Sequence, residues 1–184
     1  MTTDRRPGAF VAVVGPSGAG KDTVMGRVRD RLTDEARFVF VRRVVTRDPN
    51  GGEDHDCLDP AGFAAAAAGG AYVLSWQAHG LGYGIPAAYG RMADDGAVVI
   101  ANLSRAVLPA ARARFPRFRV LEITAPPAVL AARLKARGRE SDAEIEARLA
   151  RGDAGVTGPD VVSIDNGGAL EAAVDAAVGV LRGL

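Results

Sequence analysis

The sequence predicts an α/β fold in which helices cover a central parallel β-sheet, and three observations support this fold class. Apolar runs of strand length recur along the whole chain. Three of these runs, FVAVV, AVVIA and DVVSI, are almost entirely apolar rather than alternating, which is typical of strands buried on both faces. Helical patterns lie between the runs, and strands that alternate with helices build layered α/β domains.

The first strand leads directly into a glycine-rich segment. GPSGAGKDT, at residues 15–23, nearly matches the phosphate-binding pattern G-x-x-x-x-G-K-[S/T], and it stands between a strand and a helical pattern, as that motif requires. Glycines let successive backbone N–H groups turn toward an anion at a helix N-terminus, and Lys21 would reach the terminal phosphates. The predicted nucleotide-binding residues are Gly15, Pro16, Ser17, Gly18, Ala19, Gly20, Lys21, Asp22 and Thr23.

Asp22 occupies the position where the motif normally has a hydroxyl ligand for Mg²⁺. A carboxylate is itself a hard oxygen ligand that suits Mg²⁺, whereas the simpler interpretation is a helix-start residue favoured by the helix dipole. The apolar run AVVIANLSR ends in Asn102 and Ser104 rather than in the aspartate expected of a Walker B motif. We therefore favour Asp22 as the metal-linked residue.

The remaining elements follow from apolar periodicity and from capping residues. Asp59 and Pro60 start a helix that stops at residues 69–70, and a capping box formed by Ser141 and Glu144 starts another. The last helix places its apolar residues on one face. The other strands are expected at 38–45, 96–103, 119–125 and 160–165, and the other helices at 22–32, 104–115, 127–137 and 170–181.

Composition limits the classes of function. The 184 residues suffice for one domain, and the net charge of +1 gives no bulk electrostatic case for binding nucleic acid or membranes. The single cysteine, Cys57, precludes an internal disulfide and suits a reducing cytoplasm. No segment approaches the roughly 20 apolar residues that cross a bilayer. We expect a cytoplasmic protein and leave a homodimer open.

The middle of the chain resembles the guanylate kinase family. VVTRDPNGGE contains Thr46, Arg47 and Glu53, SWQAHGLGYG contains Trp76 and Tyr83, and ARLKARGRESDAEIEARL resembles the lid of that family. The resemblance implies a single domain of the P-loop nucleoside monophosphate kinase fold, which has three layers with the parallel sheet as the central one. Its core would comprise residues 8–37, 92–136 and 154–184, its acceptor-binding lobe about 38–91, and its lid about 137–153.

The departures from guanylate kinases concern recognition of the base. RRVV, with Arg42 and Arg43, replaces a hydroxyl residue that helps to read guanine, and Ile85–Pro86 replaces the hydroxyl that follows the Tyr-Gly pair. The combination GPSGAGKDT, RRVVTR, GGEDHD, LSWQAHGLGYGIP and RGRE resembles the ribose 1,5-bisphosphate phosphokinase family much better. That family uses ATP to make 5-phosphoribosyl diphosphate in phosphonate utilisation, and an aspartate after the loop lysine is its ordinary residue.

This resemblance implies an ATP-dependent phosphotransferase that uses Mg²⁺ and a sugar bisphosphate acceptor. The implied catalytic residues are Lys21, Arg133, Arg137 and Arg148, and the implied acceptor-binding residues are Arg43, Arg47, Glu53, Trp76, His79 and Tyr83. The alternative functions are a guanylate kinase and, more remotely, an inactive guanylate-kinase-like module that binds proteins.

Simpler interpretations of these residues remain open. The arginines of the 127–137 helix could form a solvated basic face. Trp76 and Tyr83 could fill the core of the lobe, and His79 could be structural. Arg43 could point to solvent from an edge strand. We expect His55, which lies in the acidic run GEDHD, to belong to a solvated loop.

Overall fold

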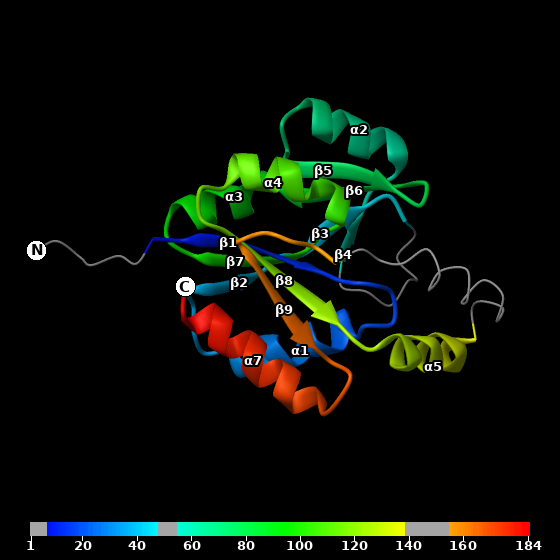
Figure 1. The fold of residues 1–184 in the computed structure, drawn as a ribbon. Coiled ribbons are helices and arrows are strands. Elements are labelled where there is room, and N and C mark those ends of the chain that lie inside the picture. Colours follow the sequence, from blue (N-terminus) through cyan, green and yellow to red (C-terminus); the bar gives the residue numbers. More distant parts are fainter. Residues whose placement is uncertain (1–6, 48–54, 139–154) are drawn as a thin grey trace, which may run out of the picture. The chain divides into compact units, whose positions relative to one another are not determined.

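The computed structural model describes residues 7–47, 55–138 and 155–184, without the side chain of Arg137. It contains two β-sheets (Figure 1). The strand order of the larger sheet is β2-β7-β1-β8-β9, and that of the smaller is β4-β3-β6-β5. In the larger sheet β2 pairs with β7 and β8 pairs with β9, both in the parallel sense, so the predicted α/β fold with a parallel sheet is confirmed.

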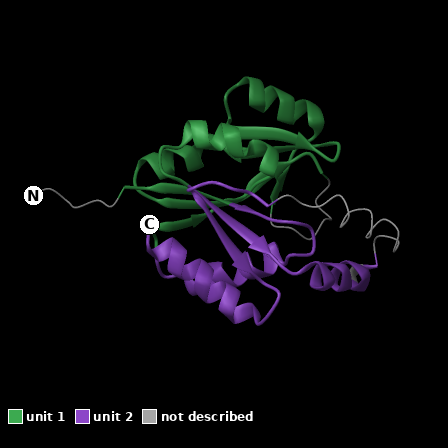
Figure 2. Cartoon of the chain, in the orientation of Figure 1, with its two compact units in different colours: residues 1–12, 36–118 green, residues 13–35, 119–184 purple. Residues whose placement is uncertain are grey.

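The chain divides into two compact units, residues 1–12 with 36–118 and residues 13–35 with 119–184 (Figure 2). β1 (Ala9–Val14) contributes to both units, and its six residues are all buried. This agrees with the almost entirely apolar composition that predicted the strand.

Besides the end of β1, the described part of the unit of residues 13–35 and 119–184 contains two strands and three helices. Helices α1 and α7 lie side by side (Figure 1). The apolar residues predicted for one face of α7 are buried from Ala173 to Leu181. Arg27 and Arg31 of α1 form ion pairs with Glu171 of α7 at 2.8 Å each. The elements are α1 (Lys21–Arg31), β8 (Phe118–Thr124), α5 (Pro127–Arg137), β9 (Val161–Asp165) and α7 (Leu170–Arg182).

The unit of residues 1–12 and 36–118 contains the smaller sheet. Helix α2 packs on β5 and β6, and α3 packs against β5 and β7 (Figure 1). Asp59 caps α2 as predicted, because its side chain accepts a hydrogen bond from the Gly62 backbone N–H at 2.9 Å. The elements are β2 (Phe38–Phe40), β3 (Arg43–Val45), β4 (His55–Cys57), α2 (Pro60–Ala68), β5 (Tyr72–Ala78), β6 (Leu81–Pro86), α3 (Ala87–Asp94), β7 (Val98–Asn102), the 3₁₀ turn η1 (Arg105–Val107) and α4 (Leu108–Arg114).

The strand predicted at residues 38–45 is two strands in different sheets. β2 pairs with β7, and β3 pairs with β4 and β6. The change of sheet occurs at Val41 and Arg42. The Val41 N–H still donates to the Ile100 carbonyl at 2.9 Å, but the Arg42 N–H donates to the hydroxyl of Tyr89 at 3.1 Å. The continuous apolar pattern therefore did not indicate that the chain passes from one sheet to the other, where the distant Tyr89 accepts a hydrogen bond.

The β5–β6 hairpin was not predicted. Its two-residue loop, His79-Gly80, has φ angles of +52° and +74°, and Ala78 pairs directly with Leu81. Two consecutive residues with positive φ are typical of the type I′ turn, whose usual sequence is Asn-Gly or Asp-Gly. The turn was not predicted because its first residue is His79 rather than the usual asparagine or aspartate. The helix expected from Ser141 lies outside the described residues.

No helix among the described residues is both long and apolar enough to cross a membrane.

Candidate active site

The glycine-rich segment forms a loop between β1 and α1, and its glycines adopt conformations that other residues rarely adopt. The φ angle is +144° at Gly15, +87° at Gly18 and +84° at Gly20. A Cβ atom on Gly15 would lie 2.0 Å from the carbonyl oxygen of Ile123 in β8, and a Cβ atom on Gly20 would lie 2.5 Å from Nδ2 of Asn166. These glycines therefore provide both the backbone conformation and the space for close packing.

Helix α1 begins at Lys21, directly after the loop, and its N-terminus has no side-chain cap. The first N–H groups of a helix lack partners within the helix, so such an end can bind phosphate. Lys21 Nζ donates to the carbonyl oxygens of Gly15 at 2.8 Å and Pro16 at 3.1 Å. The ammonium group is thus held against the loop. Asp22 and Thr23 lie exposed in the first turn of the helix.

Two residues distant in sequence contact the carbonyl groups of the loop. Asn166, at the end of β9, donates from Nδ2 to the Ala19 carbonyl at 2.7 Å. Arg133 of α5 donates from Nη1 to the carbonyls of Gly18 and Ala19, at 3.4 Å each, and from Nη2 to the Asn166 carbonyl at 2.8 Å. The simpler interpretation of Arg133, part of a solvated basic face, is wrong, because its guanidinium is partly buried against this loop.

Asn166 was missed by the sequence reasoning. A signal was present, because polar residues just beyond the carboxyl end of a parallel strand often lie at ligand sites in α/β proteins.

In the other unit, one face of the smaller sheet carries an arginine and two stacked aromatic rings. Trp76 and Tyr83 are cross-strand partners, with ring centroids 5.3 Å apart and an interplanar angle of 9°. The guanidinium of Arg43 lies 5.6 Å from the centroid of the Tyr83 ring, and Arg43 Nη1 donates to the Asn102 carbonyl at 3.3 Å. The alternative of Arg43 on an edge strand is wrong, because β3 lies between β4 and β6.

Arg47 lies at the wall of a hollow of about 430 Å³. Its Nε atom is buried and has no hydrogen-bond partner. Because a buried guanidinium nitrogen without a partner is costly, Arg47 is suited to bind an anionic group. The described residues that line the hollow are Thr46, Arg47, Cys57, Leu58, Asp59, Pro60 and Leu81.

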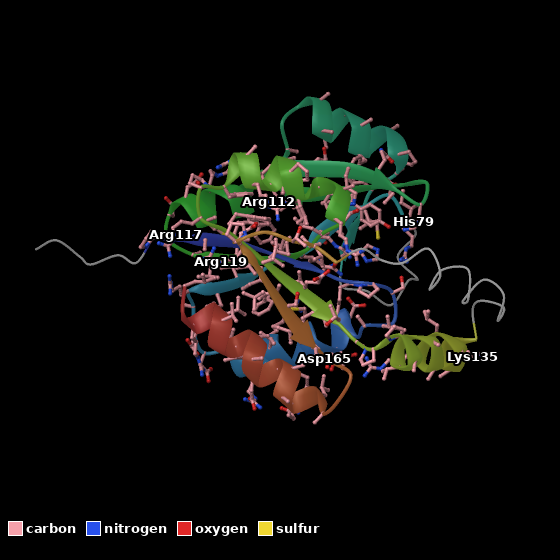
Figure 3. All side chains as sticks on the ribbon, in the orientation of Figure 1. His79, Arg112, Arg117, Arg119, Lys135 and Asp165 are labelled. Carbon is pink, nitrogen blue, oxygen red and sulfur yellow. The ribbon has the colours of Figure 1, made fainter. Side chains whose placement is uncertain are left out.

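The two histidines differ sharply in their surroundings. The expectation that His55 lies in a solvated loop is wrong, since it belongs to β4 and is only 7% exposed. Its Cα atom pairs with that of Arg43 across the parallel strands, and neither ring nitrogen has a hydrogen-bond partner. His79 instead lies exposed at the tip of the β5–β6 hairpin (Figure 3). A substrate contact by His79 stays a prediction.

Several predicted residues fall outside the description. Glu53 and Arg148 are not among the described residues, nor is the side chain of Arg137, whose backbone ends α5. The predicted lid, residues 137–153, lies outside the described residues except for residues 137–138. Within residues 7–47, 55–138 and 155–184, no group of three or more His, Cys, Asp or Glu side chains could hold a metal ion.

The shifted pKa values include those of two exposed carboxylates and one tyrosine. Hydrogen bonds from Arg27 and Arg31 lower the pKa of Glu171, and a hydrogen bond from Arg114 lowers that of Asp94. Burial raises the pKa of Tyr72.

Comparison with known proteins identifies the relatives of this chain. No family model matches it. The chain is 52% identical over 167 residues to the ribose 1,5-bisphosphate phosphokinase PhnN of Methylobacterium radiotolerans, covering 91% of this chain and 94% of that protein. It is also 52% identical to the protein of the same name from Brucella melitensis biotype 2, with 96% of this chain and 93% of that protein covered. The chain belongs to the ribose 1,5-bisphosphate phosphokinase family.

A third member of this family, from Rhizobium etli, is 46% identical over 100% of this chain and 98% of its own length. The predicted family is therefore confirmed, and with it the kinase class. Among solved structures, a guanylate kinase from Anaplasma phagocytophilum matches with a TM-score of 0.67 at 19% identity, covering 97% of this chain and 87% of that chain. This second likeness shows the fold alone, and it agrees with the predicted guanylate-kinase-like architecture.

Proposed function

We propose that the protein transfers the γ-phosphoryl group of ATP to ribose 1,5-bisphosphate and so forms 5-phosphoribosyl 1-diphosphate, a step of phosphonate utilisation. The observation that carries this proposal is 52% identity, over almost the whole chain, to proteins that bear this activity in their name. The intact phosphate loop supports the same class of reaction, because its glycines keep the close-packed backbone that the motif requires.

The phosphate loop and Lys21 would bind the phosphates of ATP. Lys21 already lies against the loop carbonyls, so a short movement of a flexible side chain would bring its ammonium to the nucleotide. Magnesium would be held by the phosphate oxygens of the nucleotide together with Asp22, directly or through water. The exposed carboxylate of Asp22 fits that role, since hard oxygen ligands suit the ion. The bound ion would neutralise charge on the phosphates.

Ribose 1,5-bisphosphate carries a phosphate at each end of the sugar, so its recognition calls for cationic donors at two places. Arg43 in β3 and Arg47, two residues beyond the end of that strand, supply such donors, and the Trp76–Tyr83 pair offers an apolar face for the sugar ring. Guanine would instead need hydrogen-bonding partners in a plane. The two arginines therefore favour a second phosphate over a base.

The acceptor is already an anion, so the reaction needs no strong general base. An oxygen of the 1-phosphate attacks the γ-phosphorus, and the bond from that phosphorus to the β–γ bridging oxygen breaks to release ADP. The contribution of this chain is alignment and charge stabilisation by Lys21 and by the arginines of α5 and the predicted lid, Arg133, Arg137 and Arg148. We place the reaction in the cytoplasm, where the single cysteine would stay reduced.

A coupled assay of ADP release with a panel of acceptors tests the proposal. We expect ribose 1,5-bisphosphate to be phosphorylated with a much higher kcat/KM than GMP or ribose 5-phosphate. Robust phosphorylation of GMP would assign a guanylate kinase instead. Absence of ATP binding, with or without Mg²⁺, would assign an inactive binding module.

A further inference from the structure

We propose that Asn166 positions the phosphate loop, by holding the Ala19 carbonyl so that the backbone N–H groups of the loop stay directed toward the phosphates. This inference rests on the nucleotide-binding part of the proposed function. It concerns a residue distant from the motif, because 147 positions separate Asn166 from Ala19.

Asn166 is itself held at three points. Its backbone N–H donates to the Thr124 carbonyl of β8 at 2.8 Å, and its carbonyl accepts from Arg133 Nη2 at 2.8 Å. Its side-chain Nδ2 donates to the Ala19 carbonyl at 2.7 Å, and the residue is only 3% exposed. A buried amide fixed in this way is a rigid anchor rather than a mobile surface group.

The bond to Ala19 determines the direction of one peptide plane. In a trans peptide the carbonyl and the next N–H point to opposite sides, so a fixed Ala19 carbonyl also fixes the direction of the Gly20 N–H. That N–H is the last of the loop before α1 begins at Lys21. Because an anion nest depends on the orientation of consecutive N–H groups, the loop geometry depends on this bond.

The same contact gives Gly20 a second reason to be glycine. A Cβ atom there would lie 2.5 Å from Asn166 Nδ2, and the +84° φ angle already disfavours a side chain. Arg133 adds its longer contacts to the Gly18 and Ala19 carbonyls. Asn166 and Arg133 thus form one network on the carbonyl side of the loop.

The isosteric variant Asn166→Asp tests the proposal, because it keeps the shape and removes the N–H donor. We expect at least about tenfold weaker binding of ATP and of inorganic tripolyphosphate, since a lost hydrogen bond is joined by repulsion between carboxylate and carbonyl. Binding of adenosine, followed by ligand-observed NMR, should stay unchanged. Asp165→Asn, on the adjacent exposed residue (Figure 3), is the matched control and should bind tripolyphosphate like the wild type.

Wild-type affinity of Asn166→Asp for tripolyphosphate would overturn the proposal. Loss of adenosine binding with tripolyphosphate binding retained would also overturn it, by assigning Asn166 to the base. If the Asp variant does not fold, Asn166→Ala decides, because it removes the donor without adding a charge and should bind tripolyphosphate more weakly than the wild type. Equal affinities for wild type and the alanine variant would contradict the proposal. Failure of the proposed function would be distinguishable from this outcome. The enzyme would then phosphorylate another acceptor, while the difference in tripolyphosphate affinity between wild type and the Asn166 variants would remain.

Discussion

The two compact units of the chain differ in how completely their buried polar groups are hydrogen-bonded. In the described part of residues 13–35 and 119–184, every buried side-chain nitrogen and oxygen has a hydrogen-bond partner. In the described part of the other unit, the buried atoms without one are Nε of Arg37, Arg47 and Arg105, the hydroxyl of Tyr72 and both ring nitrogens of His55. Since unpaired buried polar groups are costly, the polar groups around the phosphate loop are more completely satisfied than those of the other unit.

The largest expected effect tests whether the loop is built into the fold. Gly15→Ala should reduce the free energy of unfolding by about 3–5 kcal/mol, because its Cβ would meet the Ile123 carbonyl in a backbone conformation strained for alanine. Chemical denaturation measures this loss. The control is Gly26→Ala in α1, which has open space and should stabilise by about 0.5–1 kcal/mol. Equal stabilities of the two variants would contradict the close packing of the loop.

The next effect separates chemistry from folding in the same region. Lys21→Ala should lower kcat by about 10²–10³-fold with little change in melting temperature, because the lost charge stabilises transferring phosphates rather than the core. The acceptor assay and a thermal melt measure both quantities. Lys135→Ala, the exposed lysine of α5 (Figure 3), is the charge-matched control. Near-normal turnover of the Lys21 variant would refute the phosphate-loop assignment.

For the proposed acceptor, Arg43→Ala should lower kcat/KM for ribose 1,5-bisphosphate. The loss of transition-state stabilisation should be about 1.5–3 kcal/mol, which a hydrogen bond to a charged group usually contributes. The affinity for ATP should hardly change. Arg42→Ala serves for comparison, because Arg42 is exposed and forms an ion pair with Asp56 at 2.6 Å. An unchanged kcat/KM for the bisphosphate would contradict acceptor binding by Arg43 and leave it only the structural contact with the Tyr83 ring.

The smallest effect concerns the surface ion pairs between α1 and α7. The lowered pKa of Glu171 means that its contribution to stability is present above the ordinary glutamate pKa, and is lost as pH falls through the folded-state value. The melting temperatures of wild type and Glu171→Gln should therefore converge on acidification. They should also converge at high salt, because both partners are exposed. A constant difference from neutral to acidic pH would exclude this ion-pair origin.

Much of the loop could be predicted from sequence because its signal is contiguous. Strand, glycines, lysine and helix follow one another within residues 9–31. Helix α5 begins at Pro127 and ends before Gly138, and α7 carries its own apolar periodicity. Its place just beyond a strand marks Asn166 as a candidate site residue, but its partner could not be predicted, because the carbonyl of Ala19 comes from the other end of the chain.

The smaller sheet was harder to predict for two physical reasons. β3 and β4 have only three residues each, too few to show a period, and their pairing depends on tertiary contacts. The acidic neighbours of His55 suggested a solvated loop, whereas strand pairing buries the ring. Arg43 and Arg47 were chosen through family resemblance, and their contact with an acceptor stays a prediction.

The distance in sequence between the loop and its anchor also fixes when the site can form during synthesis. The ribosome makes residues 15–20 early, but Ile123, Arg133 and Asn166 follow much later. At about 5–20 residues per second, the 147 positions between Ala19 and Asn166 correspond to roughly 7–30 seconds of elongation. A nascent chain therefore carries the complete motif long before it carries the carbonyl anchor, and stable capture of a nucleotide must await nearly the whole protein.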